Sequence, residues 1–390
     1  DDVIHLYVPS SYVLDGDEGV FFEYARKIKD NVNVPVISGG GINTAEAAEN
    51  AIENNDVDMV FVGRQLIAEP EWVNKISEKR FDEIRPCVKC VECGRRILYM
   101  QCLRCAVNPQ AGKEWKVSGQ DEIPEAKTTK NVLIIGAGPA GLETARTSAL
   151  KGHNVTVIEK KDKIGGLLNL AAVPNFKYRY KQLIDYYQTQ IEKLNIEIKL
   201  NTEANKDIIN RLNPDIVIIA TGSEQIQPSI PGIENAVSSD DVLKGKEDTG
   251  ENIVMLGGGS VGAETALYLA KKGKKVTIYD ALEEPDLGLA GLSLLRPGGL
   301  FDQYGVEFYF GTPIVEIYPD KVMTVGDMGQ RQFTKADTII NAVGRKSVIN
   351  NDLKNQLKQE GILVKTIGDA KKPRKVEHAI QEGYSKALSI

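Results

Sequence analysis

Short apolar runs alternate with amphipathic segments over the first part of the chain. The apolar runs predict three buried strands, at Asp2–Val8, Val32–Ser38 and Met59–Val62. Apolar residues at helical spacing predict helices at Glu18–Asn31, from Asn43 as N-cap through Glu53, and at Pro70–Glu78. Strands that alternate with helices in this way indicate parallel βα units.

Three βα units do not close a sheet, whereas a parallel sheet needs both of its faces covered. We therefore interpret them as the last units of a TIM (β/α)8 barrel whose front lies before Asp1. The alternative is a small open α/β layer that is complete in itself.

Glycines follow the second and third apolar runs. Barrels of this kind build a phosphate site in the loops after strands seven and eight, where backbone N–H groups approach the phosphate. Glycine also ends strands for plain turn reasons, so this pattern alone leaves both interpretations open. The residues predicted for the phosphate site are Gly39, Gly40, Gly41, Gly63 and Arg64.

A strand, a glycine-rich turn, a helix and a second strand follow one another over Asn131–Lys160. The G-x-G-x-x-G spacing allows a tight turn and brings a pyrophosphate to the N-terminus of the helix. Glu159 ends the second strand, where a carboxylate bonds a ribose hydroxyl. The complete unit predicts a dinucleotide site. Its glycines are Gly136, Gly138 and Gly141, and Gly165 and Gly166 predict a second backbone approach to the same ligand.

The same pattern returns over Asn252–Asp280, with Gly257, Gly259 and Gly262 at the turn and Asp280 after the second strand. The strand at Asp337–Arg345 mirrors the earlier strand at Asp215–Gly222, which ends in the cofactor-binding candidate Gly222. The chain therefore carries two dinucleotide-binding folds.

A last strand, Gly361–Ala370, ends in Gly368 and Asp369, and a helix from about Val376 closes the chain. We expect Gly368 and Asp369 to contact a flavin. The alternative is that Asp369 only caps this region.

All five cysteines of the chain lie between Arg85 and Pro109. C-x2-C knuckles occur in structural zinc sites, and tight runs of cysteine also hold iron–sulfur clusters. The nucleotide patterns favour a 4Fe–4S cluster, because a cluster between flavin sites can transfer electrons from one flavin to the other, whereas a structural zinc cannot. The predicted ligands are Cys87, Cys90, Cys93 and Cys105, with Cys102 spare.

Charge and length narrow the function further. The chain has 390 residues, enough for two or three domains, and a net charge of −6, which disfavours nucleic acid as a partner. It contains no apolar run long enough to span a membrane. Crowded cysteines without a secretory signal predict a reducing cytoplasm and no disulfide framework.

Together these residues resemble the multidomain old yellow enzyme family, which includes 2,4-dienoyl-CoA reductase, 2-enoate reductase and trimethylamine dehydrogenase. The segments that carry the resemblance are VPVISGGG and VFVGR, the cysteine loop closing on CAVNP, GAGPAGL, and two nucleotide folds, one inserted in the other, with a final G-D-A strand. The resemblance covers essentially the whole chain but only the back portion of the family's chain.

We call the glycine-rich units at Asn131–Lys160 and Asn252–Asp280 the first and the second fingerprint. The resemblance implies FMN at the barrel loops, FAD at the first fingerprint and at Asp369, and NADH at the second fingerprint. It also implies a 4Fe–4S cluster on the four predicted cysteines. Three features depart from the family. The C-x2-C-x2-C spacing is that of trimethylamine dehydrogenase, Gly41 stands where members often carry an arginine next to FMN, and Cys102 is extra.

The expected domains are a barrel end at 1–84, a cluster loop and linker at 85–128, an FAD-binding domain at 129–228 and 346–390, and an NAD(P)-binding domain at 229–345. The implied function is an NADH-dependent reductase of an activated C=C bond that acts on a small molecule. The alternatives are an amine dehydrogenase and an electron-transfer subunit that serves a separate partner. No catalytic residue is predicted, because the family's substrate pocket lies in the barrel front, and that missing barrel half or a second copy is the expected partner.

Overall fold

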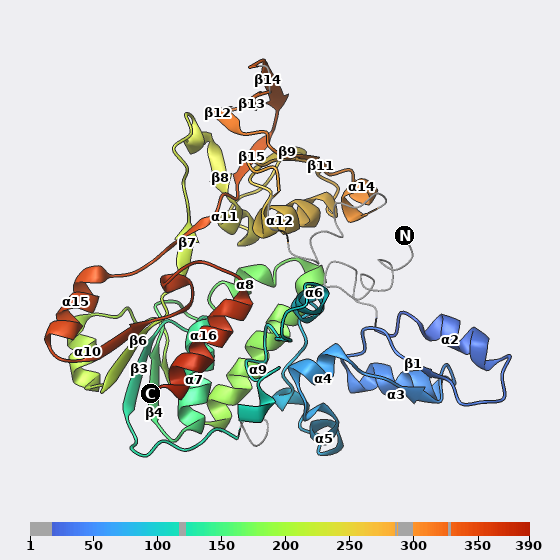
Figure 1. Ribbon diagram of the computed structural model, residues 1–390. Coiled ribbons are helices and arrows are strands. Elements are labelled where there is room, and N and C mark those ends of the chain that lie inside the picture. The colour runs from blue at the N-terminus through green and yellow to red at the C-terminus, as the bar shows by residue number, and fades with distance from the viewer. Residues whose placement is uncertain (1–17, 117–121, 285–286, 288–298, 327–328) are drawn as a thin grey trace. The chain divides into compact units, whose positions relative to one another are not determined.

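The chain folds into two compact units, seen in the computed structural model of Figure 1. The structure describes residues 18–116, 122–284, 287, 299–326 and 329–390, so the predicted strand Asp2–Val8 lies outside the described residues. The first unit holds Asp1–Asn169, Phe176–Gly222 and Ser347–Ile390, and the second holds Leu170–Asn175 and Ser223–Lys346. The main excursion into the second unit thus runs from Ser223 to Lys346, where the sequence predicted 229–345.

The barrel end of the first unit contains two short parallel strands. β1 (Ile37–Ser38) pairs with β2 (Met59–Val60), with Ile37 opposite Met59. Both strands are shorter than predicted, because each has only the other as a ladder partner among the described residues. The helices of this part are α2 (Phe22–Lys29), α3 (Ala45–Glu53), α4 (Arg64–Ala68) and α5 (Trp72–Ser77).

The N-cap of α3 differs from the prediction by one residue. The Thr44 hydroxyl accepts a hydrogen bond from the Ala47 N–H at 3.2 Å, whereas the Asn43 side chain donates to the Gly41 carbonyl. The Glu18 carboxylate completes the cap by accepting from the N–H groups of Asn43 and Thr44. Thr44 therefore caps this helix, and Asn43 supports the glycine turn before it.

The strands of the barrel end leave apolar side chains in solvent. Ile37 and Met59, which lie opposite each other, and Phe61 are each about half exposed. In a closed barrel, residues alternate between the inside and the outside of the wall, and both sets are covered. This apolar surface is suited to packing against further strands of a barrel.

The first unit also contains a parallel five-stranded sheet with the order β17–β6–β3–β4–β5. Its buried strands read as continuous apolar runs, as expected for a parallel sheet covered on both faces. The strands are β3 (Asn131–Ile135), β4 (Asn154–Ile158), β5 (Glu197–Lys199), β6 (Ile216–Ile219) and β17 (Leu363–Thr366). The helices around it include α7 (Pro139–Leu150), α9 (Arg179–Lys193), α10 (Lys206–Leu212), α15 (Asn351–Gln359) and α16 (Val376–Leu388).

The second unit repeats the parallel sheet, with the order β11–β10–β9–β15–β8. These strands are β8 (Ala236–Ser238), β9 (Asn252–Leu256), β10 (Lys275–Tyr279), β11 (Glu307–Tyr309) and β15 (Thr338–Asn341). An antiparallel sheet that the sequence did not predict consists of β12 (Ile314–Tyr318), β13 (Lys321–Val325) and β14 (Arg331–Lys335). The helices are α11 (Ser239–Leu243), α12 (Ser260–Ala270) and α14 (Leu300–Tyr304), and β7 (Ser223–Gln225) pairs with β16 (Arg345–Ser347).

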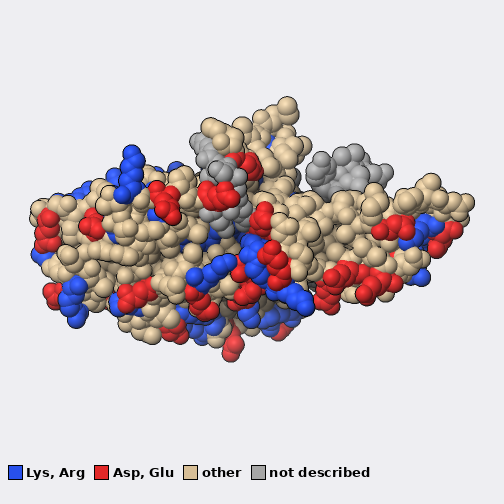
Figure 2. Space-filling model, turned by 90° about the horizontal axis from the view of Figure 1, so that it is seen from below, with Lys and Arg blue, Asp and Glu red and all other residues tan. Residues whose placement is uncertain are grey.

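The surface carries both signs of charge. Acidic and basic side chains are interspersed on the face that Figure 2 shows. Within the described part of the chain, no helix combines the length and the apolar character needed to cross a membrane.

Both glycine-rich turns bring the backbone of a helix against the strand that precedes it. A Cβ on Gly262 would lie 2.0 Å from the Gly257 carbonyl oxygen, and a Cβ on Gly141 would lie equally close to that of Gly136. Gly136 and Gly257 themselves have φ of 108° and 99°, in the region that favours glycine. The turns therefore need glycine for packing as well as for access to a ligand.

We predict that Gly262→Ala destabilises the second unit by about 1–3 kcal/mol, the usual cost of overpacking. Gly259→Ala is the matched control, because a Cβ there meets no atom within 4 Å and its φ of −63° is ordinary. Unfolding of the nucleotide-free chain in urea measures both. Equal midpoints for the two variants would contradict the packing role of Gly262.

Candidate redox site

Four of the five cysteines face one cavity in the first unit. Cys87, Cys90, Cys93 and Cys105 line it together with Arg64 and apolar residues of the same loop. Cys102 does not line the cavity and is exposed, and all five cysteines are free thiols. The structure thus brings together the four cysteines predicted as ligands and leaves out the spare one. Their role as ligands stays a prediction.

The backbone between these cysteines is held in an unusual conformation. Lys89 and Val91 have φ of 53° and 58°, a region that a β-branched residue such as Val91 rarely adopts. Left-handed residues of this kind build backbone nests, whose N–H groups converge on anions, including iron–sulfur clusters. Val91 also starts a helix that the sequence did not predict, α6 (Glu92–Leu98), which carries Cys93.

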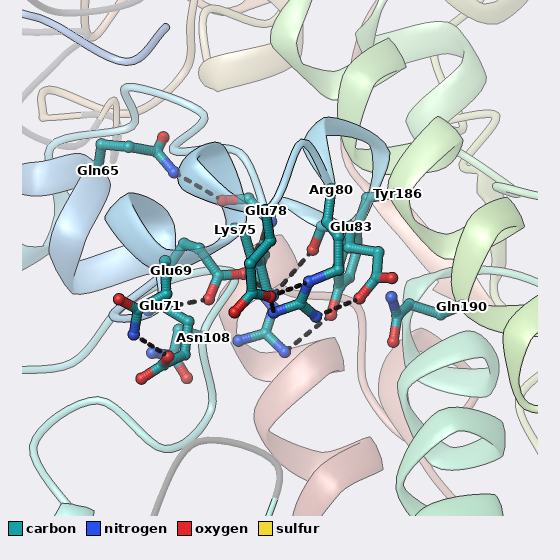
Figure 3. A network of polar contacts seen from close by, with 12 residues as sticks. Gln65, Glu69, Glu71, Lys75, Glu78, Arg80, Glu83, Asn108, Tyr186 and Gln190 are labelled. Carbon is teal, nitrogen blue, oxygen red and sulfur yellow. Dashed lines mark hydrogen bonds and ion pairs between the residues drawn. The ribbon is translucent and has the colours of Figure 1, made fainter. Parts of the chain in front are cut away.

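Buried side chains attach both ends of the cysteine loop to α4 (Figure 3). The Gln65 amide donates to the Arg85 carbonyl at 2.9 Å and accepts from the Cys87 N–H at 2.8 Å. After the last cysteine, the Asn108 amide donates to the Ile67 carbonyl at 2.9 Å. Gln65 and Asn108 are 1% and 2% exposed, so these bonds form away from water.

A buried charge network continues from this attachment (Figure 3). The fully buried Glu69 accepts from Lys75 Nζ at 2.7 Å and from the Arg85 N–H at 3.0 Å. The Arg85 guanidinium donates to the Tyr186 hydroxyl of α9 at 3.0 Å and lies over its ring. Because unpaired buried charges are costly, this pairing fixes the loop against a helix of the FAD-type fold.

Burial raises the pKa of three of the four thiols that line the cavity. It raises the pKa of Cys105 to about 12 and raises the pKa of Cys90 well above its usual value, and neighbouring thiols add to both shifts. Burial and the nearby Cys87 also raise the pKa of Cys93. A metal centre binds thiolates, so its positive charge would have to offset the cost of burying them.

The cysteine cavity offers the donor set of a cluster. Among the described residues, His, Cys, Asp and Glu side chains form no group of three or more whose present arrangement would hold a metal ion. Four thiols around a shared cavity are the donor set of a 4Fe–4S cluster, whose cysteines ligate different irons.

The loops predicted for a flavin phosphate lie at the ends of β1 and β2. Gly40 and Gly41 have positive φ, and a Cβ on Gly39 would lie 2.5 Å from the Phe61 carbonyl oxygen. Gly63 meets no such crowding and serves as the N-cap residue of α4. Arg64 follows it and lines the cysteine cavity, which the sequence did not predict.

In the first fingerprint, the predicted residues Glu159, Gly165 and Gly166 all lie against the glycine-rich turn. The Glu159 carboxylate accepts from the Ala137 N–H at 2.8 Å and from the Lys161 N–H at 3.0 Å. Gly166 approaches the turn closely, since a Cβ on it would lie 2.9 Å from the Gly138 Cα. The Gly165 N–H donates to the Ala137 carbonyl at 2.8 Å.

Gly368, which follows the last strand of the first unit, packs against α7, the helix of the first fingerprint. A Cβ on Gly368 would lie 2.7 Å from the Ala140 Cβ of α7. The Asp369 carboxylate accepts from the Arg374 N–H at 3.1 Å, a contact that fits a cap and leaves the flavin role a prediction. Gly222 has a φ of 78° and no atom near its Cβ direction, so it leaves space at the end of β6.

The second fingerprint has the same geometry as the first. The Asp280 carboxylate accepts from the Gly258 N–H at 2.6 Å and from the Leu282 N–H at 2.8 Å. Asp280 therefore braces the glycine turn and caps the turn that follows β10.

Sequence reasoning missed the residues that hold the cysteine loop in place. Gln65 and Tyr186 belong to no motif, and Tyr186 lies 101 positions from its partner Arg85. The only signal for Gln65 is a polar residue beside the apolar run of the short helix RQLIA.

Comparison with known proteins settles the family. The model of the pyridine nucleotide-disulphide oxidoreductases matches residues 107–213 and 130–374, and that of the NADH:flavin oxidoreductase / NADH oxidase family matches residues 2–83. The chain belongs to the multidomain old yellow enzyme family. Members of this family are oxidoreductases, and membership confirms the α/β fold class, with a barrel part and two Rossmann-like folds. The cofactor set of the family is FAD, FMN, NADH and a 4Fe–4S cluster.

Its relatives are longer than this chain. NADH oxidase of Thermoanaerobacter brockii is 39% identical over 94% of this chain and 57% of its own length. Cinnamate reductase of Clostridium sporogenes is 33% identical over 96% of this chain and 56% of its own length. The structure of a 2-naphthoyl-CoA reductase complex matches with a TM-score of 0.88 and 31% identity, over 98% of this chain and 58% of that one. The chain thus spans a little over half of each of these relatives.

We predict that Cys105→Ser loses bound iron and the broad visible absorbance of a cluster, because Cys105 lines the cavity. Cys102→Ser is the matched control and should keep both, because Cys102 lies outside the cavity. Iron analysis and absorbance spectra of the two purified variants test the assignment. Iron lost in the Cys102 variant alone would exchange the two roles.

Proposed function

We propose that this chain is the electron-delivery part of an NADH-dependent flavoprotein that reduces an activated C=C bond of the enoate or dienoyl-CoA type. The observation that carries the proposal is the cavity lined by four cysteines. It lies in the segment that joins a barrel end of the FMN type to a fold of the FAD type. A redox centre at that position suits a route between two flavins.

Each cofactor has candidate residues in this chain. When bound, the cofactors supply the conversion of a two-electron hydride donor into single electrons and back. The 4Fe–4S cluster would be held by Cys87, Cys90, Cys93 and Cys105, FMN by the Gly39–Gly41 and Gly63–Arg64 loops, FAD by the first fingerprint with Gly368 and Asp369, and NADH by the second fingerprint with Asp280.

The chain's own residues would position these groups and keep water away from them. Gln65 and Asn108 fasten the cysteine loop at both ends. Burial of Cys87 and Cys105, each 8% exposed, lowers the local dielectric, which strengthens every charge interaction inside the cavity. Glu159 and Asp280 each hold a glycine-rich turn in the form that a pyrophosphate needs.

One other function follows from a particular feature. The C-x2-C-x2-C spacing favours an amine dehydrogenase. The complete second fingerprint with its acid favours a working NADH site and therefore the reductase. We infer a small-molecule substrate and a partner that supplies further barrel strands or is a second copy. We also infer a location in the reducing cytoplasm, where cysteines stay without disulfides, as all five do in this structure.

We predict that NADH, added without oxygen, bleaches the flavin absorbance and then produces the electron paramagnetic resonance signal of a reduced cluster. An enoate added next should reoxidise the flavins and the cluster, provided that the sample also contains the further barrel strands found in the longer relatives. Trimethylamine in place of NADH tests the amine dehydrogenase. Bleaching by the amine, or zinc in place of iron in the purified chain, would contradict the reductase.

We predict that NADH reduces the flavin with a kcat/KM on the order of 100-fold or more above that of NADPH. The extra phosphate of NADPH would face the Asp280 carboxylate, and like charges in contact cost several kcal/mol. Stopped-flow reduction measures both rates, and Asp280→Asn should narrow the ratio. Glu251→Gln, which makes the same charge change just before β9, is the control and should leave the ratio unchanged. Equal rates for the two coenzymes in the unaltered protein would remove this role from Asp280.

A further inference from the structure

Among the described residues, Arg64 is the one charged residue that lines the cysteine cavity. It begins α4 directly after the Gly63 N-cap, so its position is set by the same helix that carries Gln65. One terminal nitrogen of its guanidinium, Nη1, is shielded from solvent and has no hydrogen-bond partner in the described part of the chain.

A buried donor without an acceptor is costly. Leaving such a group unpaired destabilises the fold, and does so more when the group is charged. The other side chains that line the cavity are the four cysteines and the apolar Ile67, Val88, Val91, Ala106 and Val107. Of the side chains that the structure describes around this cavity, only the cysteine sulfurs can therefore accept a hydrogen bond from this guanidinium.

The Arg64 side chain lines the same cavity as the four cysteines. A second cation, Lys89, lies between Cys87 and Cys90 and is only 4% exposed. The cavity thus combines four potential thiolates with positive charge that comes from outside the cysteine set.

We propose that Arg64 donates an N–H to the sulfur of the bound cluster and raises the reduction potential of that cluster. This inference rests on the proposed 4Fe–4S site and adds a role to the residue that the sequence assigned to the FMN phosphate. Reduction adds one negative charge to the cluster, and a nearby cation stabilises the reduced form more than the oxidised one. Arg64 would therefore help to draw electrons onto the cluster from the FAD side.

The experiment compares the cluster potentials of Arg64→Gln, Arg64→Lys and the unaltered protein. Each is titrated under electron paramagnetic resonance, and FMN is removed from all samples so that loss of flavin cannot mimic the effect. Arg64→Gln should weaken one-electron reduction about tenfold, equal to a fall of about 59 mV. Arg64→Lys keeps the charge but loses the fork of donors, so its potential should fall by less.

The matched control is Arg80→Gln, which removes the same charge from a surface arginine that pairs with Glu78 and Glu83. Its potential should equal that of the unaltered protein. If Arg64→Gln assembles no cluster, the potential of Arg64→Lys tests the inference instead. We expect its one-electron reduction to be about threefold weaker, which corresponds to a fall in potential of about 28 mV by the same conversion. An unchanged potential in a cluster-bearing Arg64 variant overturns the inference, and FMN loss before flavin removal would then assign Arg64 to the phosphate alone. Absence of iron from the unaltered protein would overturn the proposed cluster itself, and the inference with it.

Discussion

The attachment of the cysteine loop to α4 by buried polar side chains is the constraint on which the candidate site depends. Most of the loop is irregular, so its own backbone ladder cannot set the positions of the sulfurs. Gln65 instead holds the start of the loop, because its amide bonds both the Arg85 carbonyl and the Cys87 N–H. Asn108 holds the other end, after Cys105, by donating to the Ile67 carbonyl of α4. Each of these side chains is almost fully buried, so water cannot substitute for a lost partner.

The same attachment reaches into the nucleotide-binding fold. Arg85 bonds Tyr186 on α9, and the adjacent Tyr187 donates to Glu143 of α7 at 3.0 Å. α7 is the helix that opens at the first glycine-rich turn. A continuous set of buried contacts therefore joins the cysteine loop to the helix that would face the FAD pyrophosphate, which suits a route where electrons must cross between fixed centres.

The sequence predicted features that local chemistry dictates. The glycine-rich turns follow from close backbone contacts within a few residues, and the buried strands follow from apolar runs. Gln65, Arg64 at the cavity and the α9 tyrosines were missed because their roles come from partners distant in the chain. Thr44 rather than Asn43 caps α3, because the Asn43 side chain donates to the Gly41 carbonyl of the neighbouring glycine turn. The sequence pattern does not reveal this second contact.

The two fingerprint acids show that capping and ribose binding do not exclude each other. In both folds one carboxylate oxygen accepts from the glycine turn and the other accepts from the residue two positions on. A carboxylate offers about four acceptor sites, so two backbone bonds leave room for ribose hydroxyls. Because Glu159 and Asp280 make the same backbone contacts, those contacts do not distinguish the two nucleotide sites. What differs is side-chain length, since Glu159 is one methylene longer than Asp280 yet makes the same pair of backbone contacts.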